Sequence, residues 1–96
     1  MDIRQGDVVQ SLAGHDKGAL FCVVGTDGGF LLLADGKERK LNAPKRKRVK
    51  HARRAGQPSH PVFLRLRTGE PVGDSEVRRA LAAFRDERNQ QQSRRE

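Results

Sequence analysis

Aromatic residues are scarce in this chain: four of its 96 residues are phenylalanine, and there is no tryptophan or tyrosine. Proteins that read unpaired nucleic-acid bases stack them on exposed aromatic side chains. We expect most of the four phenylalanines in cores, which excludes a stacking platform of that kind. Long hydrophobic runs are also missing, since the longest covers six residues, 19–24. We therefore expect no membrane span, no signal peptide and a cytoplasmic location.

Groups that could carry catalysis are equally few. The single cysteine, Cys22, cannot form an internal disulfide, which suits a reducing compartment. The three histidines, His15, His51 and His60, do not have the spacing of metal ligands. No glycine-rich phosphate loop leads from a strand into a helix. We expect no catalytic residue, no metal and no cofactor, and hence a protein that is not an enzyme.

Positive charge, by contrast, is abundant and concentrated. Residues 1–36 carry two basic and five acidic side chains (net −3), residues 37–54 carry ten and one (net +9), and residues 55–96 carry eight and six (net +2). One segment of eighteen residues therefore holds more than the whole excess of +8. Such concentration indicates a docking surface for an anionic partner more than general solubilisation.

Short apolar stretches alternate with glycine-containing turns between residues 7 and 41, a pattern typical of short β-strands. We predict strands at 8–12, 19–25 and 30–34. The pairs Gly28-Gly29 and Asp35-Gly36 supply the positive φ that tight turns require. Asp35-Gly36 should lead into a returning strand at 39–41.

A flat sheet of such strands would expose its edges, so we expect it to close into a small barrel. Period-two alternation predicts one inward-facing set: Val8, Leu12, Leu20, Cys22, Val24, Leu31, Leu33 and Leu41. Phe21, Val23 and Leu32 should then lie on the other face or at a rim. The predicted fold class is mainly β, a small barrel followed by a C-terminal α-helical extension.

Residues 45–54 are the densest part of the basic segment. Pro44 favours an extended entry into it. Val49, among the charges, predicts a last strand at 49–51 that closes the barrel and presents the surrounding cations on a rigid edge. Two other interpretations stay open: a disordered solubilising tail, and a coincidental run of the nuclear-localisation type.

The chain changes character after residue 55. Residues 56–61 contain two prolines and predict a linker, whereas 62–67 fit either a short helix or a strand. Asp74 is a good N-cap for a helix over 75–89. We expect apolar residues at helical spacing to join the two pieces: Val77, Leu81 and Phe84 on Phe63 and Leu66. The predicted division is a barrel at 1–55, a linker at 56–61, a helical extension at 62–90 and a disordered tail at 91–96.

Four stretches of the chain form a recognisable series: Gly6-Asp7-Val8-Val9, then Ala13-Gly14-His15-Asp16-Lys17-Gly18, then Leu33-Ala34-Asp35-Gly36-Lys37, then Lys45-Arg46-Lys47-Arg48. Together they resemble the KOW motif, and the closest resemblance is to small bacterial KOW-domain RNA-binding proteins related to eukaryotic-type large-subunit ribosomal proteins. The resemblance spans roughly residues 4–54; Phe21-Cys22 departs from the glycine of many KOW motifs. The resemblance implies an SH3-like barrel that binds structured RNA, commonly ribosomal.

Gly14 and Gly18 allow a tight loop from whose tip His15 and Lys17 can donate to phosphates or base edges, and Asp16 should cap backbone amides of the turn. The predicted RNA-binding residues are His15, Lys17, Lys37, Arg39, Lys40, Lys45, Arg46, Lys47, Arg48, Lys50, Arg53 and Arg54. A helix-turn-helix reader is disfavoured, because Glu76, Asp86 and Glu87 interrupt the basic face of the helix.

The predicted partner is RNA, ribosomal RNA or the large ribosomal subunit, bound by a monomer with no membrane contact. Two alternatives from other classes remain. One is a transcription-associated KOW module that contacts polymerase. The other is a protein-interaction adaptor whose basic run only keeps it soluble.

Overall fold

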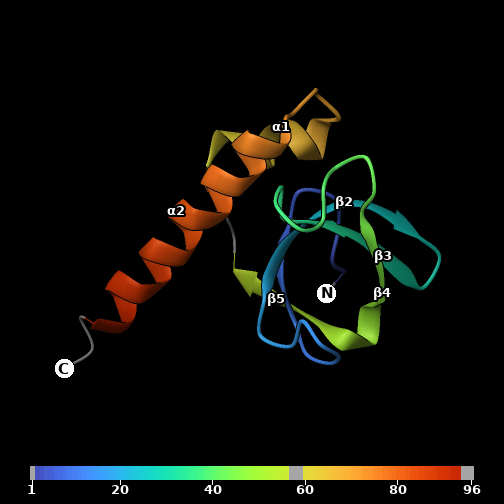
Figure 1. Cartoon of the computed structure of the whole chain (residues 1–96), viewed down its shortest axis with the longest axis horizontal. Coiled ribbons are helices and arrows are strands. Elements are labelled where there is room, and N and C mark those ends of the chain that lie inside the picture. Colours follow the sequence, from blue (N-terminus) through green and yellow to red (C-terminus); the bar gives the residue numbers. More distant parts are fainter. Residues whose placement is uncertain (1, 57–59, 94–96) are drawn as a thin grey trace.

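A computed structural model describes residues 2–56 and 60–93 of the chain, and the side chains of those residues as far as 90 (Figure 1). The elements in chain order are β1 (Val8–Ser11), β2 (Leu20–Asp27), β3 (Phe30–Ala34), β4 (Lys45–Arg48), the 3-10 turn η1 (Val49–His51), β5 (Ala52–Gly56), α1 (Pro61–Thr68) and α2 (Asp74–Ser93). The fold is mainly β, as predicted: one five-stranded antiparallel sheet with two helices after it.

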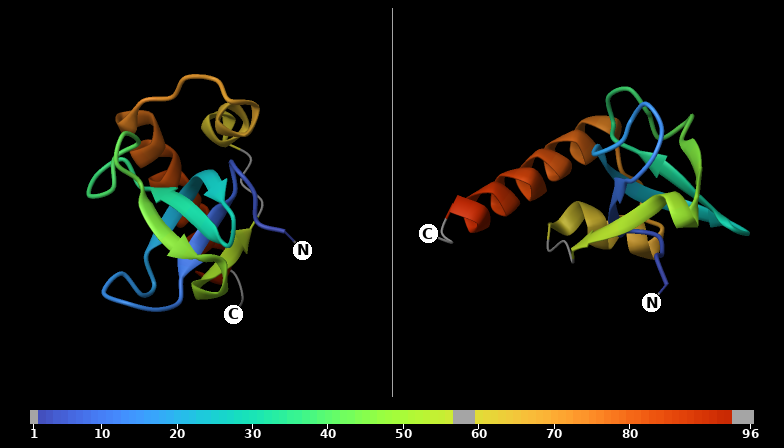
Figure 2. Two further views of the ribbon diagram at one scale, coloured as in Figure 1. Left: turned by 90° about the vertical axis from the view of Figure 1, so that its right-hand side faces the viewer. Right: turned by 90° about the horizontal axis from the view of Figure 1, so that it is seen from below.

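The sheet has the order β4-β3-β2-β1-β5, so that consecutive strands β4 and β5 lie at its opposite edges. A flat five-stranded sheet would hold its edge strands about 19 Å apart. Only the three residues of η1 join β4 to β5, and a connection of that length spans at most about 14 Å. The sheet must therefore curl, and register shifts at Val8/Val9 and Val23/Gly25 add local bends (Figure 2).

The strand predicted at 49–51 is wrong, because those residues form η1. The backbone N–H of Val49 donates to the Gly29 carbonyl at 3.0 Å, which ties this turn to the β2–β3 hairpin. The basic residues before and after the turn belong to the two edge strands. The basic segment is thus ordered, although through β4 and β5 instead of a strand at Val49.

One of the two predicted glycine turns is a hairpin and the other is not. Asp27 pairs with Phe30, so Gly28-Gly29 forms the two-residue turn, with Gly28 at φ 62°. The returning strand predicted at 39–41 is wrong, because the partner of β3 is β4 and residues 35–44 form an irregular connection, here called the 35–44 loop. At its start the Asp35 carboxylate accepts the backbone N–H groups of Lys37 and Arg39 at 2.9 and 2.8 Å.

Gly36 was predicted to form a hairpin turn, but its backbone lies against the first turn of α2. Its φ is +77°, and an added Cβ would overlap the Asp74 carbonyl oxygen and lie 3.0 Å from the Arg78 nitrogen. Arg78 donates to the Gly36 carbonyl at 3.1 Å, and the Leu41 N–H donates to the Asp74 carboxylate at 2.8 Å. The 35–44 loop therefore docks α2 onto the sheet.

Both faces of the sheet are buried, which the inward-facing prediction missed. The concave side holds Val9, Phe21, Val23, Leu31, Leu33 and Ala52. The other side packs Val8, Leu20, Cys22 and Ala34 against α1 and α2. The prediction placed Leu20 and Cys22 inside with Leu31, and was wrong because helices cover the second face of β2, so that alternation no longer marks the core. Leu12, also predicted inside, is 40% exposed.

Both helices begin at recognisable capping residues. The His60 ring accepts the Val62 N–H, and Pro61 starts α1, which settles residues 62–67 as helix. The N-cap predicted at Asp74 is displaced by one residue: the Gly73 N–H donates to the Glu76 carboxylate at 2.8 Å in a capping-box arrangement. That bond and the Arg65 guanidinium lower the pKa of Glu76.

The predicted packing of Val77, Leu81 and Phe84 on Phe63 and Leu66 is confirmed. The helix predicted to end at residue 89 continues to Ser93, so residues 91–93 of the predicted tail are helical. Residues 57–59 of the predicted linker and 94–96 of the tail lie outside the described residues.

Gly36→Ala should destabilise the protein by about 2 kcal/mol or more, because it adds strain at positive φ and pushes the start of α2 away from the loop. Urea unfolding at neutral pH measures the loss. Gly29→Ala is the matched control, since an added Cβ there meets no atom within 4 Å. Equal stability of the two variants would contradict the docking role of Gly36.

Candidate nucleic-acid interface

Strand β4 sorts its four cations onto two sides of the sheet edge. Lys45 and Lys47 point toward the loop between β1 and β2, here called the 12–19 loop, whereas Arg46 and Arg48 are exposed. This separation follows from period-two alternation of side chains along a strand. The four consecutive basic residues of β4 are therefore of two kinds: lysines that face the 12–19 loop and arginines that face solvent.

Lys47 is a buried lysine whose ammonium has three acceptors. Its exposed fraction is 8%. The Nζ atom donates to the Ser11 hydroxyl at 2.8 Å, to the Ala13 carbonyl at 2.7 Å and to an Asp16 carboxylate oxygen at 2.9 Å. An ammonium has three donors, so its hydrogen bonding is saturated inside the protein. In the free protein the Lys47 charge attaches β4 to the 12–19 loop, and the predicted contact of Lys47 with RNA stays a prediction.

Asp16 is the counter-charge of this attachment. Its carboxylate accepts from the Ser11 hydroxyl at 2.7 Å and from the ammonium groups of both Lys45 and Lys47. Partial burial raises the pKa of Asp16, but these three hydrogen bonds outweigh it and hold the pKa well below the usual range. Asp16 braces the loop as predicted, although through side chains where backbone amides were expected.

The 12–19 loop presents His15 and Lys17 on a fixed turn. Gly14 and Gly18 both have positive φ, 88° and 92°. The Gly18 N–H donates to the Ser11 carbonyl at 2.8 Å, and the Lys17 N–H donates to the Gly14 carbonyl at 3.2 Å. Both predicted donors are exposed at the tip. The loop geometry predicted for the two glycines is thus present.

The two arginines of β4 stay exposed but are oriented by neighbours. The Arg46 guanidinium carbon lies 4.3 Å from the centre of the Phe30 ring, and that of Arg48 lies 5.0 Å from it. Arg46 also pairs with Asp27 at 3.1 Å, in a bridge whose side chains are more than half exposed. Cation–π contacts at such sites contribute about 0.5–1 kcal/mol each, enough to favour one orientation without removing the charges from solvent.

The remaining cations of the segment divide in the same way. Lys50 and Arg53 are exposed, with Arg53 donating to the Gln10 side chain at 2.8 Å. Arg54 is largely covered, and its Nε lies 3.7 Å from the fully buried Asp7 carboxylate. We call Arg46, Arg48, Lys50 and Arg53 the basic edge.

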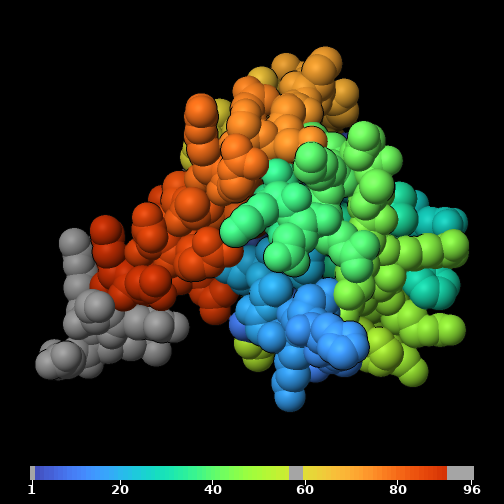
Figure 3. All heavy atoms as spheres, in the orientation of Figure 1, coloured from blue at the N-terminus to red at the C-terminus, as the bar shows by residue number. Residues whose placement is uncertain are grey.

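The 35–44 loop adds the exposed cations Lys37, Arg39 and Lys40 beside the 12–19 loop. The two loops share the walls of a hollow of about 270 Å³, to which His15 and Arg39 both contribute. In space-filling view, the loops lie between α2 and the β4 strand on one face of the molecule (Figure 3). The structure therefore leaves most predicted contact residues exposed and turns Lys45, Lys47 and Arg54 toward ion pairs.

Sequence reasoning overlooked the arginines of α2. Arg78, Arg85 and Arg88 line a groove against the sheet. Their spacing of seven and three residues marks one helical face, which was the available signal. The partner of that face, the start of β2, lies far away in sequence.

Residues 2–56 and 60–93 contain no group of three or more His, Cys, Asp or Glu side chains that could hold a metal ion. Burial raises the pKa of the Cys22 thiol to about 12, which keeps it protonated and unreactive. Among the same residues, no helix is long and apolar enough to cross a membrane.

Comparison with known proteins identifies no relative: no family model matches the chain, and no curated protein matches its sequence.

Lys47→Met should cost about 2 kcal/mol or more of stability at neutral pH, because it removes a buried ammonium and leaves three acceptors short of a donor. Denaturant unfolding measures this cost. Arg48→Met, one residue along on the exposed side, is the control and should cost less than about 1 kcal/mol.

The same variant has a pH signature. A depressed carboxylate pKa contributes stability that is present above the ordinary aspartate pKa, about 3.9, and is lost as the pH falls below it. Removing Lys47 makes the pKa of Asp16 less depressed, so the variant should lose less stability than the wild type between pH 7 and pH 3. An equal loss in both proteins would contradict the pairing of Lys47 with Asp16.

Proposed function

We propose that this chain is an RNA-binding protein that holds structured ribosomal RNA through the basic edge and the 12–19 loop. The observation that carries the proposal is the ordered presentation of Arg46 and Arg48 on an edge strand whose neighbouring lysines are fixed by Asp16. Exposed cations on rigid backbone bind phosphates without the cost of ordering the backbone at the moment of binding. The protein would then act as a ribosomal-like or ribosome-associated component.

The proposed fold is an SH3-like barrel of the KOW type. Its support is the strand order, with the first strand between the second and the fifth, and the short η1 turn that brings the two edges of the sheet near one another. The interior of this barrel would be the cluster around Phe21 and Leu31. The resemblance of residues 4–54 to KOW proteins agrees with this arrangement.

The aromatic side chains favour recognition of RNA shape and backbone over reading of unpaired bases. Phe21, Phe63 and Phe84 are 3%, 2% and 8% exposed. The fourth, Phe30, has the Arg46 and Arg48 guanidinium groups near its ring. Affinity should therefore depend on phosphate contacts, and folded RNA is the expected partner.

Reversal of charge on the basic edge tests the proposal. The double variant Arg46→Glu/Arg48→Glu should bind purified bacterial large-subunit ribosomal RNA at least about tenfold more weakly at low salt, and its plot of log K against log salt should be shallower by about 1.4–1.8, two phosphate contacts. Filter binding over a salt series measures both quantities, and circular dichroism checks the fold.

Arg4→Glu/Arg79→Glu is the matched control, since it makes the same change in net charge at two exposed arginines that are not part of the basic edge. This control should bind nearly as well as the wild type. The proposal is wrong if the wild-type protein shows no salt-dependent affinity for the RNA, or if a folded edge variant binds as tightly as the wild type. Co-sedimentation with ribosomal particles that resists RNase would instead favour the protein-contact alternatives.

A further inference from the structure

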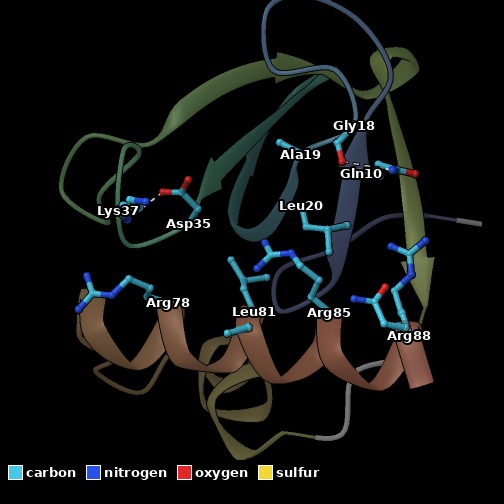
Figure 4. Close-up of a pocket in the computed structure, with 12 residues that line it drawn as sticks. Gln10, Gly18, Ala19, Leu20, Asp35, Lys37, Arg78, Leu81, Arg85 and Arg88 are labelled. Carbon is cyan, nitrogen blue, oxygen red and sulfur yellow. Dashed lines mark hydrogen bonds between the residues drawn. The ribbon is translucent and has the colours of Figure 1, made fainter. Parts of the chain in front are cut away.

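A groove of about 520 Å³ runs between α2 and the start of β2, outside the basic edge (Figure 4). One wall is the α2 face that carries Arg78, Arg85 and Arg88. The opposite wall comes from the end of the 12–19 loop, including Gly18, and from the 35–44 loop, including Lys37. Leu20 and Leu81 lie between the walls, so the groove has an apolar floor beneath polar rims.

The charge of this groove is strongly positive. Four of its twelve lining residues are Lys or Arg, and Asp35 is its one acidic residue. The Asp35 carboxylate accepts two backbone N–H groups of the 35–44 loop and is a single negative charge against four positive ones. Asp86 and Glu87, the acidic residues that interrupt the basic face of α2 in sequence, do not line the groove.

The groove cations are available to a ligand. Within the described residues, no carboxylate lies at ion-pair distance from Lys37, Arg85 or Arg88. Arg88 lies over the Phe84 ring at 6.0 Å, a contact that positions the guanidinium without neutralising it. Arg78 keeps one donor on the Gly36 carbonyl, and a guanidinium has five N–H donors in all.

The dimensions suit a polyanion. Arg88 follows Arg78 by ten positions in α2, which corresponds to about 15 Å along the helix axis. A nucleic-acid strand presents several successive phosphates over that length. The shallow floor of two leucines offers little to a single small anion and is compatible with the sugars of a strand.

The groove also adjoins the 12–19 loop, which is part of the RNA-binding surface proposed above. Gly18 and Ala19 belong to its wall, while the other side of the same loop is attached to β4 through Asp16. Figure 3 shows α2, the two loops and β4 following one another across one face. An RNA strand that lies along this face meets cations at both ends of the face.

We infer that the groove between α2 and β2 binds the sugar–phosphate backbone of the same RNA that contacts the basic edge, as a second contact site. The inference rests on the proposed function and adds α2 to the binding surface. Arg85 and Arg88 hold phosphates at one rim and Lys37 at the other. The helix thus contributes to affinity besides covering the sheet.

The double variant Arg85→Ala/Arg88→Ala tests this assignment on the full chain with large-subunit ribosomal RNA. Affinity at low salt should fall about five- to tenfold, and the salt slope should become shallower by about 1.4–1.8. Arg4→Ala/Arg79→Ala, which removes the same charge outside the groove, should bind nearly like the wild type. Groove variants that keep the wild-type affinity and slope would overturn the inference.

A second measurement leaves the arginines of the groove unchanged. The native thiol is buried, with its pKa raised to about 12, so an Ala82→Cys substitution creates a single reactive thiol in the groove for a tethered hydroxyl-radical cleavage reagent. Leu64→Cys on α1, at a residue 56% exposed, is the control position. Strand cleavage from residue 82 and none from residue 64 is expected.

The outcomes separate the two claims. If the wild-type protein does not bind the RNA, the proposed function fails and the groove inference fails with it. If Arg46→Glu/Arg48→Glu weakens binding but the reagent at residue 82 cuts no RNA, the groove inference alone is wrong.

Discussion

The attachment of Lys47 to Asp16 and Ser11 is the interaction on which the arrangement of the charged surface depends. It joins β4, an edge strand, to the 12–19 loop through a buried ammonium with all three donors used. A buried charge with unmet partners is costly, so strand and loop must keep these positions together. This contact therefore fixes the positions of the exposed arginines of β4 and of the tip of the 12–19 loop relative to each other.

The same strand shows how lysine and arginine take different places within one run. The compact ammonium groups of Lys45 and Lys47 turn toward a single carboxylate. The planar guanidinium groups of Arg46 and Arg48 lie near the Phe30 ring and remain exposed. Guanidinium groups stack on aromatic rings while keeping donors for a phosphate. Positive charge therefore supports the fold on one side of β4 and remains available to a ligand on the other.

Local patterns predicted those elements that local chemistry specifies. The strand at 30–34, the turn at Gly28-Gly29 and the apolar stripe of α2 follow from alternation, positive φ and helical spacing. The burial of Lys47 could not be predicted in this way, because its partners Ser11 and Asp16 lie 36 and 31 positions away. The role of Gly36 also depends on a residue distant in sequence, because its contact with Asp74 exists only after α2 has docked. The dipeptide Asp35-Gly36 was therefore mistaken for a hairpin turn.

The order of the basic segment in the free protein provides the most direct test, since the interpretation depends on a rigid edge and the alternative is a solubilising tail. Backbone ¹⁵N relaxation over residues 45–54, without RNA, measures it. We expect order parameters of about 0.85, as in rigid backbone, throughout β4, η1 and β5. Values below about 0.6 across this segment would contradict an ordered edge.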